Sequence, residues 1–167
     1  NTNFANPHGY HSKNHYSTAR DLAIIAREAM KNTEFRKIVS TTSYTLPKTN
    51  KHKKRTLATS DAMLLESSTH YYPYEIGIKT GYHSKAGQCF VGAAEKDGVT
   101  LISVTLKTSK SGRWTDTRRL MEYGFTLLGA GDMNAQNAFG GFDTDDAQDD
   151  VADVFDDIET VEALDAF

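Results

Sequence analysis

Two long apolar segments separated by a tight turn constrain the fold of this 167-residue chain more than any other feature. Residues 88–95 and 99–107 are rich in apolar and β-branched side chains, and Lys96-Asp97-Gly98 lies between them. An Asp-Gly pair between two apolar runs is a strong sequence signal of a β-hairpin. The sequence therefore predicts an antiparallel pair of strands against which the other elements must pack.

A further strand is predicted directly before the hairpin, within the segment YEIGIKTGYHSKAG at residues 74–87. Lys79, Thr80 and Gly81 follow one another in this strand. A lysine in a half-buried strand loses hydration unless an anionic group lies beside it. A glycine in a strand often marks a place where a ligand or another backbone approaches closely. We therefore expect this strand to receive an anionic, peptide-like ligand.

Helices are expected before and after these strands. Thr18 is expected to cap a helix that runs to about Met30, with Asp21 in a capping-box relation to it. Thr33 is expected to cap a short helix over residues 34–39. A last amphipathic helix is expected to begin at Thr115 or Asp116, and its inward residues are Leu120, Tyr123, Phe125 or Thr126, and Leu127.

Between the second helix and residue 74, the pattern predicts one strand and a basic loop. The alternation over residues 40–46 is typical of a strand that Pro47 stops. Residues 48–55 (KTNKHKKR) are predicted to form a polar connection. The basic cluster at residues 51–55 fits a solvated loop, with Arg55 as a minor candidate for holding an anionic ligand.

Acidic and basic residues are divided unequally along the chain. All 19 Lys and Arg lie at or before Arg119, whereas 10 of the 22 acidic residues precede residue 131 and the other 12 follow it. This division predicts a folded body over residues 1–131 and an acidic linker over residues 132–150. Apolar residues at helical spacing over residues 151–164 favour an acidic amphipathic helix, and a solvated tail is the alternative.

The remaining patterns favour neither a metal nor a nucleic-acid site. His8, His11 and His15 have a spacing that suggests metal ligands, but their loop is irregular and no cysteine or carboxylate cluster completes the set. Residues 143–146 lack the third oxygen ligand and the turn glycine of a calcium loop. The basic residues of the body are scattered and form no nucleic-acid motif. Cys89 is expected to be an inert, buried thiol.

Several short motifs occur in a suggestive order: Asn6-Pro7-His8-Gly9, YSTARDLA at residues 16–23, GIKTGY at residues 77–82, and Ala86-Gly87. Together they resemble the second half of the penicillin-binding domain of D-alanyl-D-alanine carboxypeptidases, the low-molecular-mass penicillin-binding proteins. The resemblance covers about residues 1–128. It implies an α/β fold of the α+β type, in which an antiparallel sheet is flanked by helices as in β-lactamases and transpeptidases, and which is incomplete in this chain.

The resemblance also implies a serine-type enzyme that removes the terminal D-alanine of peptidoglycan stem peptides through an acyl-enzyme, needs no cofactor and binds β-lactams. Lys79 would stabilise the anionic site and orient a serine of a Ser-x-Asn motif. Thr80 would bind the substrate's terminal carboxylate, and Gly81 would leave room for the substrate backbone. The N–H of Tyr82 would form one half of the oxyanion hole. His83, where the family usually has threonine, is a further candidate for substrate binding.

The nucleophile of this family is missing from the chain. No Ser-x-x-Lys occurs, and Ser12-Lys13-Asn14 lies after the Asn-Pro-His-Gly element, whereas the family's Ser-x-Asn motif precedes it. The chain alone is therefore expected to be inactive. Its serines would belong to sequence upstream of Asn1, either as the missing part of a truncated protein or as a companion N-terminal fragment.

Two other functions fit the same residues. One is a non-catalytic module of this fold that binds a cell-wall peptide or a protein partner, and the other is a relative of class A β-lactamases. In each case we expect a bacterial protein of the cell envelope or a secreted one, whose signal peptide is not in this chain. The acidic segment at residues 151–164 has the wrong charge for binding anionic lipid surfaces.

Overall fold

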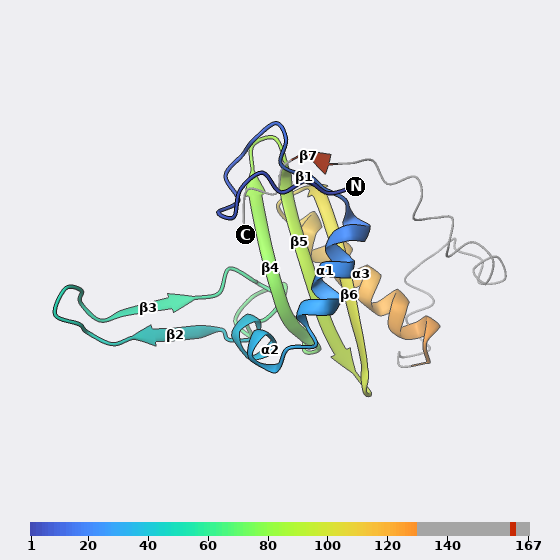
Figure 1. Cartoon of the computed structure of the whole chain (residues 1–167). Helices are drawn as coiled ribbons and strands as arrows, with labels where there is room; N and C mark the ends of the chain where they lie inside the picture. Colours follow the sequence, from blue (N-terminus) through green and yellow to red (C-terminus); the bar gives the residue numbers. More distant parts are fainter. Residues whose placement is uncertain (130–160, 163–167) are drawn as a thin grey trace.

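The computed structural model describes residues 1–129 and 161–162 (Figure 1). The predicted linker over residues 132–150, including the acidic residues 143–146, lies outside the described residues, as does most of the expected helix over residues 151–164. Two residues of that helix are described, and they differ from the expectation. Val161–Glu162 form a short strand, β7, because their backbone pairs antiparallel with β1 (Tyr16–Ser17).

A three-stranded antiparallel sheet forms the centre of the molecule, in the order β4 (Glu75–His83), β5 (Gly87–Lys96), β6 (Val99–Thr108). The predicted hairpin is confirmed, with Lys96 paired to Val99. Asp97 and Gly98 both have positive φ, 52° and 80°, which is the backbone conformation that an Asp-Gly hairpin turn requires. β4 is one edge of this sheet and β6 is the other.

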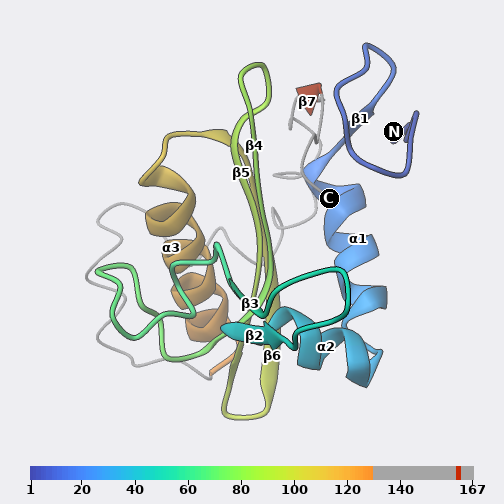
Figure 2. The ribbon, with the colours of Figure 1, turned by 90° about the vertical axis from the view of Figure 1, so that its left-hand side faces the viewer.

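Helices cover both faces of the sheet (Figure 2). α1 (Ala19–Ala29) lies on one face and buries Leu22 and Ala26 against apolar side chains of β5. Its predicted N-cap is confirmed, since the Thr18 hydroxyl accepts a hydrogen bond from the Asp21 N–H at 3.1 Å. α3 (Gly112–Leu127) lies on the other face. The predicted antiparallel sheet flanked by helices is therefore present.

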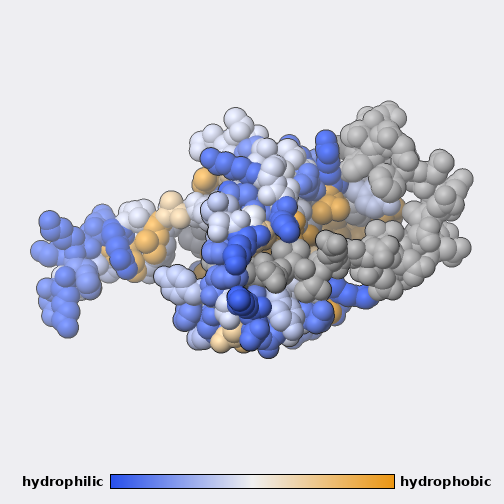
Figure 3. All heavy atoms as spheres, turned by 90° about the horizontal axis from the view of Figure 1, so that it is seen from above, coloured by the Kyte–Doolittle hydropathy of each residue, from blue (hydrophilic) through white to orange (hydrophobic). Residues whose placement is uncertain are grey.

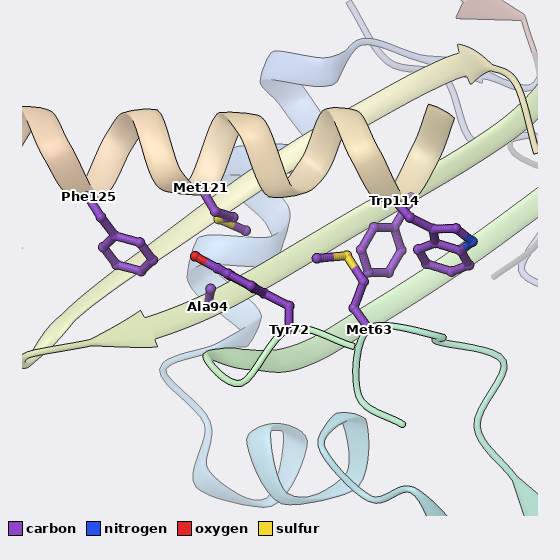
Figure 4. Packing of buried hydrophobic residues seen from close by; sticks show 7 residues of the cluster. Met63, Tyr72, Ala94, Trp114, Met121 and Phe125 are labelled. Atoms are coloured by element: carbon purple, nitrogen blue, oxygen red, sulfur yellow. The ribbon is translucent and has the colours of Figure 1, made fainter. Parts of the chain in front are cut away.

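The start of α3 differs from the prediction, and its buried face agrees with the prediction only in part, since Phe125 is the predicted inward residue that is buried. The helix begins after Ser111 rather than at Thr115 or Asp116, and the Ser111 side chain makes no capping hydrogen bond. The earlier start includes Trp114 in the helix. Leu120 and Leu127 are 48% and 46% exposed, and the buried side chains of α3 that pack into the core are Trp114, Met121 and Phe125 (Figure 4).

α2 (Thr33–Val39) is capped by Asn32 rather than by Thr33, because the Asn32 side-chain oxygen accepts hydrogen bonds from the N–H groups of Glu34 and Phe35. β2 (Ser43–Leu46) confirms the predicted strand. It pairs with β3 (Arg55–Ala58), a strand that falls partly in the predicted loop. These two strands form an arm that extends away from the body (Figures 1 and 3).

The segment that connects β3 to β4, residues 59–74, is anchored in the core between the sheet and α3. Met63 is fully buried among aromatic side chains of the α3 face, and its carbonyl accepts a hydrogen bond from the Tyr72 N–H at 2.9 Å. Cys89 is buried on the α1 face, as predicted. No helix within the described part of the chain has the length and apolar character needed to cross a membrane.

Candidate active site

All five predicted site residues, Lys79 to His83, lie in the second half of β4. Thr80 is buried and only 8% exposed, whereas Tyr82 is 61% exposed. Lys79 and His83 are half-buried. Because β4 is an edge strand, alternate backbone groups on its outer side face away from β5 and are available to a ligand.

Gly77 brings β4 close to α2. It has φ of +124° and lies at a register shift between β4 and β5. A Cβ at this position would be 2.9 Å from Cγ2 of Val39 and 3.0 Å from the Val39 carbonyl oxygen. Glycine is required here both for its backbone conformation and for the close approach of α2. This contact fixes the strand just before Lys79.

The ammonium group of Lys79 is held near the strand that carries it. Its Nζ donates a hydrogen bond to the Thr80 carbonyl oxygen at 2.6 Å. Burial lowers the pKa of Lys79, because removing water disfavours the charged form. An anionic ligand beside this lysine would replace the lost hydration and raise its pKa again.

The hydroxyl group of Thr80 contacts Ser60, a residue that the sequence did not indicate as part of the site. Ser60, which lies between β3 and the core, has its Oγ 2.6 Å from Oγ1 of Thr80. The two residues are 20 positions apart, and no sequence motif includes both of them. Thr80 is thus fixed by a tertiary hydrogen bond as well as by the β4–β5 pairing.

His83 stacks on His11 at the end of β4. Their ring centroids are 5.0 Å apart and the rings are inclined by 13°. His8 and His15 are directed elsewhere: His8 packs on Tyr10, and the Nδ1 of His15 accepts a hydrogen bond from the Ala5 N–H. Within residues 1–129, no group of three potential metal ligands is found. The contacts of these histidines are thus ring packing and one hydrogen bond, and His11 lies against the predicted site residue His83.

Two buried carboxyl groups lie on the α3 side of the site. Burial raises the pKa of Asp61 to about 6, although its carboxylate accepts a hydrogen bond from the Met63 N–H at 2.8 Å. Burial and the charge of Asp61 raise the pKa of Glu75 to about 9. Glu75 accepts a hydrogen bond from the Ala93 N–H across the β4–β5 register shift. At neutral pH Glu75 is therefore an uncharged acid.

Arg113 supplies a second cation close to the site. Its guanidinium carbon lies 4.3 Å from the centre of the Trp114 ring, and burial lowers its pKa against the opposing effect of Asp61. Asp61 follows Ser60 in the chain, so the guanidinium lies near the segment that contacts Thr80. The sequence did not identify Arg113, because the last helix was expected to begin after it.

Comparisons with known proteins agree with this arrangement. The family model for D-alanyl-D-alanine carboxypeptidase matches residues 1–110. A D-alanyl-D-alanine carboxypeptidase of a Streptomyces species is 40% identical over 131 residues, which are 76% of this chain and 44% of that protein. The carboxypeptidase DacF of Bacillus subtilis is 31% identical over 127 residues, 75% of this chain and 31% of that protein.

Solved structures show the same fold. The crystal structure of a Streptomyces DD-transpeptidase has a TM-score of 0.62 and 36% identity, and the match covers 70% of this chain and 44% of that one. A D-alanyl-D-alanine carboxypeptidase from Mycobacterium tuberculosis has a TM-score of 0.61 and 33% identity over 71% of this chain and 45% of that one. The chain thus spans less than half the length of these relatives.

An antiparallel sheet between helices, with Lys79-Thr80-Gly81 on its edge strand, defines a protein of the transpeptidase-like class. Within this class the chain belongs to the D-alanyl-D-alanine carboxypeptidase family, peptidase S11. It contains part of that family's catalytic domain.

Proposed function

We propose that this chain forms the Lys-Thr-Gly side of a serine-type D-Ala-D-Ala carboxypeptidase that acts on peptidoglycan stem peptides. The observation that carries the proposal is the placement of Lys79, Thr80 and Gly81 on the open edge of β4 in a member of this family. A peptide that lies along this edge meets a half-buried ammonium group and a fixed hydroxyl group.

The chemistry requires a nucleophile from outside residues 1–167, since no Ser-x-x-Lys occurs in them. In the proposed reaction the serine oxygen attacks the carbonyl carbon between two D-alanines, the C–N bond breaks and D-alanine leaves. Water then hydrolyses the resulting ester. The N–H of Tyr82 on the edge strand would stabilise the oxyanion, and the charge of Lys79 would stabilise the anionic groups around it.

Thr80 and Arg113 are proposed to receive the substrate's terminal carboxylate. The Thr80 hydroxyl group supplies a hydrogen bond, and Arg113 supplies a positive charge near the segment that holds this hydroxyl. Gly81 leaves space for the approaching peptide backbone. His83, supported by His11, would contact the substrate farther along the strand.

The proposal includes a companion segment with Ser-x-x-Lys and Ser-x-Asn, either on the same polypeptide or as a separate fragment. Within the described residues, β6 has no neighbouring strand on its outer edge, and such a segment would cover it. Peptidoglycan lies outside the cytoplasm, so we place the protein in the cell envelope or among secreted proteins.

Intact mass measurement and gel analysis, followed by labelling with a fluorescent penicillin, test this function. We expect a companion segment that becomes covalently labelled and a complex that releases D-alanine from a D-Ala-D-Ala peptide. A preparation without such a segment, and without label, would contradict the catalytic role of this material and favour a non-catalytic peptide-binding module.

A transpeptidase is the second candidate, because several structural neighbours bear that name. Both reactions pass through the same acyl-enzyme, and they differ in whether water or an amine accepts the acyl group. Supplying an amine acceptor during the D-alanine release assay separates them, since a transpeptidase yields the amide product instead of the free acid.

A further inference from the structure

We propose that Ser60 is a positioning residue for the carboxylate-binding hydroxyl of Thr80. In this arrangement Ser60 donates its hydroxyl hydrogen to Oγ1 of Thr80, so that the hydrogen of Thr80 points to the terminal carboxylate of the substrate. The inference rests on the proposed function, which assigns that carboxylate to Thr80.

The distance between the two hydroxyl oxygens, 2.6 Å, is that of a short O–H···O hydrogen bond. Thr80 is 8% exposed, whereas Ser60 lies at the surface. Most of Thr80 is therefore shielded from water, and Ser60 supplies a defined hydrogen-bond partner for its hydroxyl group. A ligand arriving at β4 meets a threonine hydroxyl group whose orientation is already restricted.

Proton counting gives the direction of this hydrogen bond when an anion is bound. A hydroxyl group has one hydrogen to donate and two lone pairs that accept. A carboxylate only accepts, so Thr80 must donate its hydrogen to it. The 2.6 Å contact is then satisfied only if Ser60 is the donor. A hydroxyl group that accepts one hydrogen bond also becomes a stronger donor, which strengthens the bond to the carboxylate.

Ser60 is held by a turn that is attached to the core. The N–H of Asp61 donates to Oγ1 of Thr59 at 3.1 Å, and the N–H of Met63 donates to Oδ1 of Asp61 at 2.8 Å. Met63 is fully buried, and Asp61 is 3% exposed. The N–H of Thr59 donates to the Thr42 carbonyl oxygen at 2.8 Å, at the base of the arm. Ser60 thus lies between two fixed residues rather than at the tip of a free loop.

A double-mutant cycle in a protein that contains this chain together with its Ser-x-x-Lys and Ser-x-Asn segments tests the proposal. The variants are Ser60→Ala, Thr80→Val and the double substitution, with Ser67→Ala as an exposed serine control. The measured quantity is kcat/KM for a peptide ending in a free carboxylate and for the same peptide ending in an amide.

We expect Ser60→Ala to lower kcat/KM about fivefold for the free acid, the size of one neutral hydrogen bond, and to leave the amide unchanged. In the Thr80→Val background Ser60→Ala should have no further effect. An equal loss in both backgrounds, or for both peptides, would overturn the proposal, because Ser60 would then act independently of Thr80 or of the carboxylate.

A second measurement uses residues 1–167 alone and does not depend on catalysis. We expect the NMR methyl signal of Thr80 to shift in Ser60→Ala and to remain in place in Ser67→Ala. An unchanged signal in both variants would show that the hydroxyl contact does not form, and this also overturns the proposal. Failure of the proposed function has a different result: the contact is present in the spectrum, but no preparation, including the wild type, reacts with penicillin.

Discussion

The negative charge of Asp61 adds to burial in holding Glu75 in its protonated form, with a pKa of about 9. Glu75 nevertheless accepts a hydrogen bond from the Ala93 N–H at 3.2 Å, so it remains a part of the β4–β5 contact. A buried acid at the beginning of the strand that carries the site makes the stability of this strand depend on pH.

Stability should fall as pH rises through the neutral range, because the folded pKa of Glu75 lies above the ordinary value of 4.5. The favourable contribution is complete below about pH 4.5 and is lost progressively up to about pH 9, with a slope of at most about 1.4 kcal/mol per pH unit. Glu75→Gln should flatten this dependence in urea unfolding at pH 5, 7 and 9. The exposed control Glu66→Gln should retain it, and a flat wild-type profile would contradict the burial of an ionisable group.

Trp114 should be essential for the core on the α3 face. It meets Phe90 edge-on with ring centroids 5.0 Å apart, and it is 5% exposed. Trp114→Ala should lower the free energy of unfolding by about 3–5 kcal/mol, whereas Leu120→Ala on the exposed side of the same helix should cost less than about 1 kcal/mol. Urea unfolding followed by circular dichroism measures both. Similar losses for the two variants would contradict the helix orientation.

Gly77→Ala should destabilise the chain more than Gly98→Ala. Both glycines have positive φ, so each alanine introduces backbone strain of roughly 1–2 kcal/mol. A Cβ at Gly98 meets nothing within 4 Å, whereas at Gly77 it lies 2.9 Å from Val39. The difference between the two variants in thermal unfolding therefore reports the contact of α2 with β4. Equal effects would mean that α2 can move away from β4 without a loss of stability.

Lys79→Met should separate stability from function. Burial disfavours the charged form of this lysine, and this cost offsets the contacts that its removal breaks, among them the hydrogen bond to the Thr80 carbonyl oxygen. The urea midpoint of this chain should therefore change little. In a complete enzyme the same change should reduce penicillin acylation by about 100-fold, on the order of one charged interaction in the transition state. Lys85→Met, outside the site on the exposed turn, is the matched control for both assays. Loss of folding in Lys79→Met would assign this lysine a structural role.

The parts of the fold that the sequence predicted are those governed by local signals. The Asp97-Gly98 turn and the Thr18 cap each depend on residues within a few positions of one another. β3 was missed because all four of its residues are exposed, so the strand has no alternation of buried and exposed side chains. The beginning of α3 was placed too late because Thr115 and Asp116 are also residue types that cap helices, whereas the observed N-cap is Ser111, whose side chain makes no capping hydrogen bond.

The same distinction between local and distant contacts applies to the candidate site. Lys79 to His83 are consecutive residues and could be identified together as one motif. The Ser60–Thr80 hydrogen bond joins residues 20 positions apart, and the His11–His83 stack joins the N-terminal loop to the end of β4. Contacts of this kind depend on how the strands and helices pack, and no periodic pattern in the sequence predicts them.

The outer edge of β6 has a consequence for the behaviour of this chain in solution. Ten residues of this strand, with Lys107 as their one charged side chain, present backbone groups for which the described residues provide no neighbouring strand. An exposed, long and largely uncharged edge strand is a template for intermolecular pairing. At high protein concentration the chain should therefore self-associate through β6, and its solubility will depend on how this edge is occupied.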